Sequence, residues 1–556
     1  MLEPPTLALA LLAAALPPAR SAIGSSAADW VALPTPRLCE PAMTGSHPGP
    51  LASGSHILSR NDGLPLPGSQ SAPRLPVSTL IKMVEDDARS RSARIEFFRS
   101  ASGLLARGDP AAIEAARARI AEIERAADNL QIDLEIDLAG SAGAAGTAPE
   151  HFTGKSSVGS GEEAFLGRRD ATPFVMSFDV EVAADSGIAA PVLGTAAHGR
   201  TLHLRASRIE GGKRIHLEGL LDLADLSEMA RFDPETPDLG TLQEPRVDFV
   251  QIAFAGVVES GAALEVEITG APLQLPSWKL SIRAVTRADG APAPANAGSS
   301  SSSASAGKPA GGNTDAFDVI DLAFLASEST SIPNAGPGAE LDRQAFFVQP
   351  RRATIPIPPS AIAAALDLRG ADGSSRTGSG SSGATATAWS DDLLILPRSD
   401  AAGDAEARAL IAAAEKARTS TLRIEAKRGG LVARFPVCSG SPGRLLAGRE
   451  RTALVGYRAE IAPQTWMPAP AVERSFDGLS LAVEVQSGGA DCSTWIAESA
   501  GEEVVARQDA QLGQIQVLRR NLRSERAGLR AGDPERALAS GPAANADAVL
   551  VRVAAP

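Results

Sequence analysis

The sequence predicts a mixed α+β and all-β protein made of two duplicated units, each a small α-β-β-α-β module followed by a β-rich domain. Three observations predict this fold class. Helical apolar stripes and short alternating segments succeed one another over residues 77–139, and a similar order returns over residues 316–427. A β-like stretch also repeats at a constant spacing. Tracts rich in Gly, Ser and Pro separate these parts and are expected to be disordered linkers.

The composition excludes some classes of function. The chain has 556 residues and a formal net charge of −13, which argues against a general nucleic-acid binder, because such proteins need a basic surface to neutralise phosphates. This length predicts about three or four domains. Aromatic residues make up only 4% of the chain, so the cores must be built from Ala, Val, Leu and Ile. Small cores of this kind gain from packing against neighbouring modules.

Residues 1–22 have features of a signal peptide. An uncharged run of Leu and Ala covers residues 7–16, and small residues around Ala22 follow it, as at a signal-peptidase site. The only ionised side chain before the run is Glu3, so a misassigned start codon or an apolar tail is the alternative interpretation. Export to the periplasm or outer membrane is expected. No later segment reaches the roughly 20 apolar residues of a transmembrane helix, although association with a membrane surface stays open. Residues 23–76 are predicted to be a disordered leader.

The first α+β module is expected over residues 77–139. Ser78 can cap its first helix, and the pair Asp-Pro at 109–110 is typical of the start of a second helix, because Pro fits the first helical position. Strict alternation of apolar with polar or acidic residues over 130–138 predicts a half-buried strand. Two shorter strands are expected at 94–99 and 103–107.

The first β-rich domain is expected over residues 163–287. Gly211 and Gly212 separate two alternating segments, and a two-residue glycine turn is typical of a tight hairpin. Such a hairpin would place Arg205 opposite Glu218, a favourable cross-strand pair. Further strands are expected at 247–257 and 263–268.

A second unit follows a Ser-rich linker at residues 288–315. Its α+β module is expected over 316–427, with a Gly- and Ser-rich insertion at 370–383, and its β-rich domain over 428–556. Residues 140–162 are interpreted as a loop or linker of the same kind. The elements expected in the second module are a helix at 360–366, strands at 384–389 and 393–396, a helix at 404–418 and a strand at 421–426.

A repeated stretch indicates the duplication. Residues 178–183 (Phe-Asp-Val-Glu-Val-Ala) match residues 457–462 (Tyr-Arg-Ala-Glu-Ile-Ala), and without a gap Gly199 then falls on Gly478. The spacing is 279 residues throughout, and glycine, proline and alternating apolar positions keep their type. Because both stretches alternate, the repeated halves are predicted to be β.

The segment that enters the first β-rich domain resembles a known family. Residues 104–110 (Leu-Leu-Ala-Arg-Gly-Asp-Pro) precede a helix, and residues 131–136 (Gln-Ile-Asp-Leu-Glu-Ile) follow it as an acidic strand. This order resembles the ring-building modules of the secretins of type II and type III secretion systems and type IV pili. The resemblance implies a non-enzymatic, oligomeric component of the cell envelope whose modules pack side by side. The chain has no copy of the Val-Pro-x-Leu-Gly-Asp-Ile-Pro type of motif found in the secretin pore, so a scaffold rather than a complete channel is implied.

The three cysteines are Cys39, Cys438 and Cys492. None belongs to a CxxC pair, so a structural zinc site is not expected. In an exported protein, Cys438 and Cys492 could form a disulfide. Two buried thiols are an equally good interpretation.

The motifs indicate no catalytic, cofactor or metal site. Residues 154–156 (Gly-Lys-Ser) end like a phosphate-binding loop, but Pro149 stands where the loop needs its first glycine. His203 and His216 with Glu218 provide too few ligands for a metal, and the histidines are expected to be exposed on a strand.

Two charged groups are more typical of surfaces. Asp133, Glu135 and Asp137 form one face of a strand, where alternate carboxylates stand about 7 Å apart, too far to chelate one ion unaided. A solvated face that protects a sheet edge is expected. A basic cluster from Arg519 to Arg530 could contact an anionic lipid, a glycan or an acidic protein, or be a solvated helix face. Its members are Arg519, Arg520, Arg523, Arg526 and Arg530.

The sequence therefore predicts an exported, non-enzymatic, secretin-like scaffold or interaction protein of a secretion or pilus machine. Its expected partners are further copies of itself or other envelope proteins, without a cofactor. Two alternatives remain. One is an extracytoplasmic adhesion or binding module, and the other is a hydrolase with a carboxylate site that the motifs do not reveal.

Overall fold

The structure is a computed structural model, and its described residues divide into two compact units, the first within residues 1–37 and 77–124 and the second within residues 125–556. The described residues are 31–33, 77–90, 92–100, 103–141, 149–182, 187–233, 240–270, 275–287, 317–326, 361–362, 387–388, 393–397, 401–419, 421–428, 430–439, 443–462, 465–485, 491–498, 506–511, 515–518 and 549–554.

The first unit packs two helices on a small sheet. Its elements are β1 (Val31–Leu33), α1 (Val77–Ser90), β2 (Ile95–Ser100), β3 (Gly103–Gly108) and most of α2 (Pro110–Asn129), and the strand order is β1-β3-β2. Leu80 and Val84 of α1 and Ile120 and Ile123 of α2 are buried, as their helical spacing predicts. The helices and the two strands predicted from sequence are confirmed. The disordered-leader prediction is wrong for residues 31–33, because their backbone pairs with β3 and the side chain of Leu33 is buried.

The second unit is built on two eight-stranded antiparallel sheets. The short sheet has the order β21 (Ile515–Leu518), β22 (Val549–Ala554), β15 (Thr421–Arg428), β16 (Leu431–Cys438), β10 (Ala263–Thr269), β11 (Trp278–Thr286), β4 (Gln131–Gly140) and β5 (His151–Gly159). The long sheet has the order β20 (Ala506–Gln511), β19 (Asp491–Glu498), β18 (Thr465–Val485), β17 (Gly443–Ala462), β9 (Leu242–Glu259), β8 (Arg214–Phe232), β7 (Gly187–Ile209) and β6 (Glu163–Val182).

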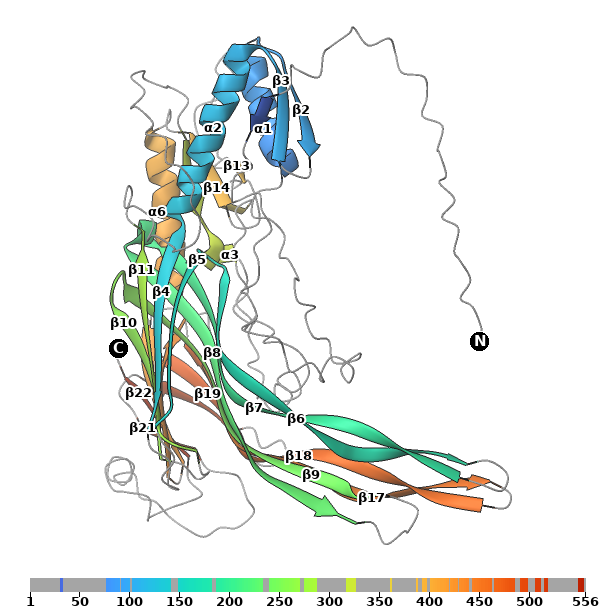
Figure 1. The fold of residues 1–556 in the computed structure, drawn as a ribbon. Helices are drawn as coiled ribbons and strands as arrows, with labels where there is room; N and C mark the ends of the chain where they lie inside the picture. Colours follow the sequence, from blue (N-terminus) through green and yellow to red (C-terminus); the bar gives the residue numbers. More distant parts are fainter. Residues whose placement is uncertain are drawn as a thin grey trace, which may run out of the picture. The chain divides into compact units, whose positions relative to one another are not determined.

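The main core lies between these two sheets. Ile132 and Leu134 of the short sheet and Leu204 and Leu217 of the long sheet belong to one buried cluster that also includes residues of β15, β16, β17 and β18. Figure 1 shows the strands of the long sheet continuing beyond the short sheet as extended hairpins. Alternation places every second residue of these strands in the core, which is why a chain with few aromatic residues can fill it with Leu, Ile and Val.

The strand order follows a regular rule among the described residues. A third sheet, with the order β12 (Phe317–Asp321), β14 (Leu393–Pro397) and β13 (Thr387–Ala388), has the arrangement of β1-β3-β2. In the short sheet β5-β4-β11-β10 is followed by β16-β15-β22-β21, and in the long sheet β6-β7-β8-β9 is followed by β17-β18-β19-β20. Adding eleven to the number of a strand in the first half therefore gives the number of the equivalent strand in the second half.

The register of two hairpins follows the same rule at the level of residues. Phe178 pairs with Pro191 in β6–β7, and Tyr457 pairs with Pro470 in β17–β18, so both pairs are related by the spacing of 279. Each hairpin also has a register shift in its first strand, between Val175 and Ser177 in β6 and between Leu454 and Gly456 in β17. These two shifts are related by the same spacing.

The long sheet curls at the end where its hairpins extend. Val180 of β6 and Met467 of β18 share a small buried cluster, although four strands separate β6 from β18 in the sheet order. The hydroxyl of Ser177 donates a hydrogen bond to the carbonyl of Pro470 at 3.0 Å. Phe174 of β6 and Phe249 of β9 also share a buried cluster, although two strands separate β6 from β9 in the sheet order.

The structure corrects two expectations about residues 130–162. The strand predicted at 130–138 exists as β4, but it pairs with β5 and β11 rather than with β2 and β3, because its apolar face is buried in the main core. The predicted linker at 140–162 contains β5. Gly154 lets this strand approach β6, since a Cβ there would stand 2.6 Å from Cδ1 of Leu166.

The second α+β module has its main helix, α6 (Ala401–Arg418), where the sequence predicts it, and a short helix, α3 (Ala323–Ala326), precedes it. Leu322 and Leu325 pack against Ala407 and Ile411 of α6. Most of the helix predicted at 360–366, and the insertion at 370–383, lie outside the described residues. None of the described helices is both long and apolar enough to cross a membrane.

Candidate assembly interface

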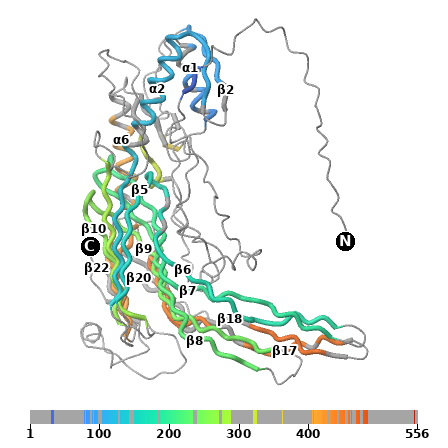
Figure 2. Tube along the Cα trace, viewed as in Figure 1, coloured from blue at the N-terminus to red at the C-terminus, as the bar shows by residue number. Residues whose placement is uncertain are grey.

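The two halves of the second unit meet at a junction in each sheet. In the long sheet, β17 pairs with β9 over eight residue pairs, from Arg444–Ala253 to Arg451–Arg246. In the short sheet, β10 pairs with β16 over three residue pairs. Figure 2 shows β17 and β9, which are distant in sequence, running side by side. Both sheets are therefore continuous across the junction.

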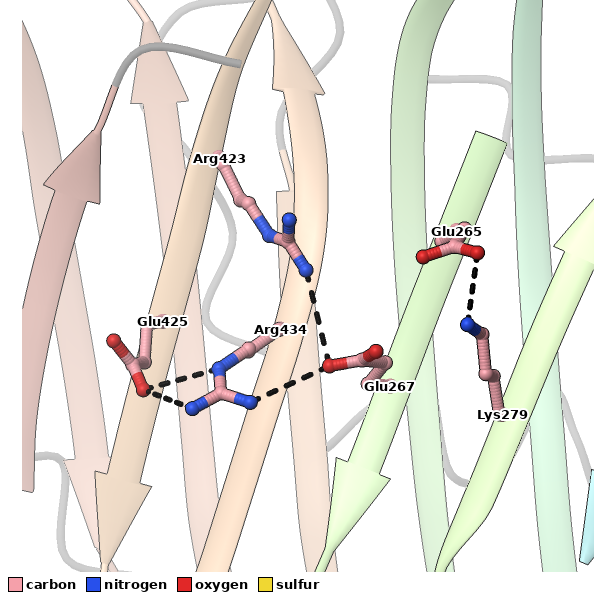
Figure 3. Close-up of polar contacts among 6 residues, drawn as sticks. All are labelled: Glu265, Glu267, Lys279, Arg423, Glu425 and Arg434. Atoms are coloured by element: carbon pink, nitrogen blue, oxygen red, sulfur yellow. Dashed lines mark hydrogen bonds and ion pairs between the residues drawn. The ribbon is translucent and has the colours of Figure 1, made fainter. Parts of the chain in front are cut away.

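Charged side chains bridge the junction in the short sheet. Arg434 of β16 donates to Oε1 of Glu425 from Nη2 at 2.8 Å and to Oε2 of Glu267 from Nη1 at 3.4 Å. Glu267 lies on β10, so it links the first half to the second, and Arg423 of β15 approaches it at 3.8 Å. Figure 3 shows this network on one face of the sheet, beside the pair of Lys279 with Glu265. The hydrogen bonds that Arg434 donates to Glu425 raise the pKa of Arg434.

The same face carries the acidic stripe expected from the sequence. Arg287 contacts Asp133 at 3.1 Å, and Lys155 contacts Glu135 at 2.8 Å. The hydrogen bond from Lys155 lowers the pKa of Glu135. His151 contacts Asp137 at 2.6 Å. Each carboxylate of the stripe thus has a basic neighbour on an adjacent segment, which agrees with a solvated face. The expectation that the stripe protects a sheet edge is wrong, because β4 lies between β5 and β11. Among the described residues, no group of three or more His, Cys, Asp or Glu could hold a metal ion.

A stronger ion pair bridges the junction in the long sheet. Arg449 of β17 donates two hydrogen bonds to Asp248 of β9, at 2.6 and 3.0 Å. The Asp248 side chain is 1% exposed, whereas that of Arg449 is 39% exposed. A two-pronged guanidinium contact fixes geometry as well as charge. Because Asp248 is buried, this pair selects the register of β9 against β17 more strictly than exposed pairs do.

Two hydrogen bonds reinforce the junction on either side. The carboxylate of Glu244 in β9 accepts a bond from the backbone N–H of Leu454 at 3.2 Å. The hydroxyl of Thr421 in β15 accepts one from the N–H of Val257 in β9 at 3.2 Å. Both bonds join the first half to the second, so the junction involves side chains, backbone and both sheets.

The expectation of exposed histidines is wrong for His216. Its side chain is buried and its ring lies 4.6 Å from that of Phe324. Burial, followed by the charges of Arg205 and Arg418, lowers the pKa of His216 to about 3, so the ring is neutral. The predicted pairing of Arg205 with Glu218 across β7 and β8 is confirmed. An alternating pattern cannot show that both faces of a strand are covered. The sequence therefore predicted an exposed His216, whereas its side chain is buried.

Glu415 of α6 is a buried carboxyl that the sequence did not single out. Its Oε2 accepts a hydrogen bond from the backbone N–H of Glu210 at 3.0 Å. Burial raises the pKa of Glu415 to about 7, the bond from Glu210 opposes this rise, and the charges of Glu210 and Asp321 add to it. Glu210 lies in the turn between β7 and β8 with a φ of 51°, so this contact holds a turn that non-glycine residues rarely adopt.

Cys438 is buried, and its Sγ lies 3.2 Å from the hydroxyl of Thr421. Burial raises its pKa to about 12, so the reactive thiolate is suppressed. Cys438 lies in the short sheet and Cys492 in the long sheet. The side chain of Cys492 lies outside the described residues, and the disulfide between the two stays a prediction.

Two other sequence signals do not contribute to the candidate interface. Residues 154–156 lie within strand β5, so they form no loop that could enclose a phosphate. Of the basic cluster, Arg519 to Arg530 all lie outside the described residues. Local sequence patterns did not predict the junction, because more than 150 residues of chain separate the strands that pair there. The repeat spacing was the signal that could have suggested it.

Comparison with known proteins gave no match to any family model and none among curated proteins. The solved structures that resemble this chain include the secretin-domain β-barrel of InvG from the Salmonella SPI-1 injectisome (10% identity, 48% of this chain and 89% of that chain, TM-score 0.21). Another is the Vibrio cholerae type IV competence pilus secretin PilQ (10% identity, 43% and 90%, TM-score 0.18). A third is the ETEC pilotin–secretin complex AspS–GspD (8% identity, 37% and 59%, TM-score 0.18). TM-scores near 0.2 do not establish a common fold, so these likenesses assign no family.

Proposed function

We propose that this protein is a non-enzymatic, secretin-like scaffold of the cell envelope that assembles side by side with further copies of itself or with other envelope proteins. The observation that carries the proposal is the double junction, at which two sets of strands, each ordered alike, join edge to edge in two sheets at once. Because one set of strands already pairs with the edge of the other within a chain, strands of a further chain could pair with a sheet edge in the same way.

The sequence supports the same role from a different direction. Residues 104–110 and 131–136 resemble the ring-building modules of secretins. In the structure they lie in β3 with the start of α2 and in β4, although β4 pairs in the short sheet and not with β3. The matching order of strands and the spacing of 279 support a duplication of one unit. In this proposal the periplasm or outer membrane is the location, and a secretion or pilus machine is the context.

The test is the assembly state of the full-length protein. The chain, purified from the envelope fraction of an expressing bacterium, is measured by light scattering across the micromolar range and imaged by electron microscopy. The expected result is a regular assembly of many chains. A strictly monomeric protein throughout that range, or a protein confined to the cytoplasmic fraction, would contradict the proposal. Turnover of a substrate that depends on a single carboxylate would favour the hydrolase instead.

A further inference from the structure

Equivalent strands of the two halves run in the same direction. Each half contributes four consecutive strands to each sheet, and every neighbouring pair is antiparallel. Because four is even, β17 points the same way as β6, and β16 the same way as β5. The second half therefore follows the first by a repeated step rather than by a two-fold rotation, which is a heterologous type of contact.

The step leaves complementary edges at the two ends of the sheets. The leading edge consists of β6 and β5, and the trailing edge consists of β20 and β21. In the described part of the chain, each of these four strands pairs with only one neighbour. At the internal junction the equivalent strands are β17 and β16 on one side and β9 and β10 on the other. The leading edge thus corresponds to one side of the junction and the trailing edge to the other.

We propose that the trailing edge of one chain pairs with the leading edge of a second copy, repeating the internal junction, so that each chain supplies two consecutive positions of one continuous pair of sheets. This inference rests on the proposed function and names its partner and contact. An assembly of this kind contains twice as many repeat positions as chains.

The known register defines the leading side of the proposed contact. At the internal junction, Arg444 pairs with Ala253 in the long sheet. The spacing of 279 that relates the hairpins β6–β7 and β17–β18 places Phe165 at the position of Arg444. Phe165 precedes Phe174, Ser177 and Val180, the residues of β6 that contact β9 and β18 across the curl.

The pairing of β18, β19 and β20 defines the trailing side. Cys492 pairs with Val485 and Ala510 as Leu217 pairs with Ala206 and Gly256 in the first half. These pairings make Cys492 equivalent to Leu217 and Ala510 equivalent to Gly256. Counting along the strands, Arg507 then occupies the position of Ala253. The proposed contact therefore pairs Arg507 of one chain with Phe165 of the second copy.

Cysteine cross-linking of the full-length chain tests this register. Cys39 and Cys492 are replaced by serine, and Cys438 is kept because its thiol is buried. Chains with Phe165→Cys and chains with Arg507→Cys are co-expressed under different tags, and the assembly is oxidised. Paired antiparallel residues have Cα atoms about 4.5–5.5 Å apart, within the range of a disulfide. A disulfide-linked dimer that carries both tags is expected.

The control keeps the strand and changes the position. Gln511→Cys replaces Arg507→Cys, four residues further along β20 and about 13 Å away, which is too far for a disulfide. The Arg507 variant should give at least about tenfold more linked dimer than the control, given this difference in distance. Thr269→Cys with Val432→Cys, a pair at the internal junction, should link within one chain and show that oxidation works.

The outcomes separate the two proposals. Assemblies that form without the Phe165–Arg507 link, or that link equally through Gln511, would overturn the proposed contact and leave the scaffold function standing. Phe165→Cys chains that link to one another would show a symmetric contact instead and would also overturn it. The proposed contact would also be overturned if electron microscopy showed assemblies with only as many repeat positions as chains. A chain that stays monomeric would remove both proposals.

Discussion

Removing the guanidinium of Arg449 should destabilise the junction in the long sheet. Arg449→Ala leaves the Asp248 carboxylate, 1% exposed, without the two hydrogen bonds it now accepts at 2.6 and 3.0 Å. Breaking a buried ion pair from one side costs about 3–5 kcal/mol. Arg449 is itself 39% exposed, so water can partly replace it, and a loss near the lower limit, about 3 kcal/mol, is expected.

The assay is urea unfolding of the full-length chain followed by far-ultraviolet circular dichroism. With an m-value of about 3 kcal/mol/M, a loss of this size lowers the midpoint by about 1 M urea. Arg449→Lys should recover only part of the loss, because an ammonium cannot make the two-pronged contact. Adding Asp248→Asn to Arg449→Ala should recover stability, since it removes the uncompensated charge.

The matched control is Arg246→Ala, which removes an arginine of β9 whose ion pair joins β9 to β8 rather than to β17. Arg246 contacts Glu228 at 2.5 Å, with side chains 38% and 50% exposed, so its loss should cost less than about 1 kcal/mol. Equal effects of Arg246→Ala and Arg449→Ala would refute the reasoning, because burial of Asp248 would then make no difference.

Three further predictions concern other parts of the second unit. The folded pKa of Glu415, about 7, lies above its ordinary value of 4.5, so the stability that this group contributes is present below pH 4.5 and lost as the pH rises through 7. Between pH 5 and 8 this loss of stability should be on the order of 3 kcal/mol, as urea titrations can measure. Glu415→Gln should abolish it, and a pH profile of stability unchanged by the substitution would contradict this explanation. Gly167→Ala should lower stability by about 1–3 kcal/mol, because φ is 147° and a Cβ would stand 2.1 Å from a backbone oxygen. Gly456→Ala, where a Cβ meets nothing within 4 Å, should change the melting temperature much less, and similar shifts for both would be inconsistent with this account. Cys438 should resist a maleimide in the native protein and react once unfolded in urea, as mass spectrometry of labelled peptides can show; rapid native labelling would contradict its burial.

Local patterns predicted most of the individual elements of this fold. The glycine pair at 211–212 predicted a hairpin and the register of Arg205 with Glu218, which the structure confirms. Asp-Pro at 109–110 located the start of α2 to the residue. The alternation over 130–138 identified β4. Each of these signals depends on residues close in sequence, and such signals are carried by propensity, turn geometry and periodicity.

The pairing of distant strands could not be predicted in the same way. A period of two shows that one face of β4 is buried, but it does not name the strand beside it. The contact of Glu267 with Arg434 joins segments whose local patterns contain no reference to each other. His216 is a further example, because what covers it comes from Phe324, about a hundred residues away. The junction, and with it the candidate interface, therefore emerged only from the structure.

The double junction also determines the order in which the chain can fold. β10 ends at Thr269 and its partner residues in β16 begin after residue 430, about 160 residues later. At a synthesis rate of 5–20 residues per second, about 10–30 s pass between the synthesis of β9 and β10 and that of their partner strands β17 and β16. During this interval both strands expose unpaired backbone that another chain could occupy. Folding of the first half and capture by a neighbouring chain therefore compete for the same two strands while the second half is still being made.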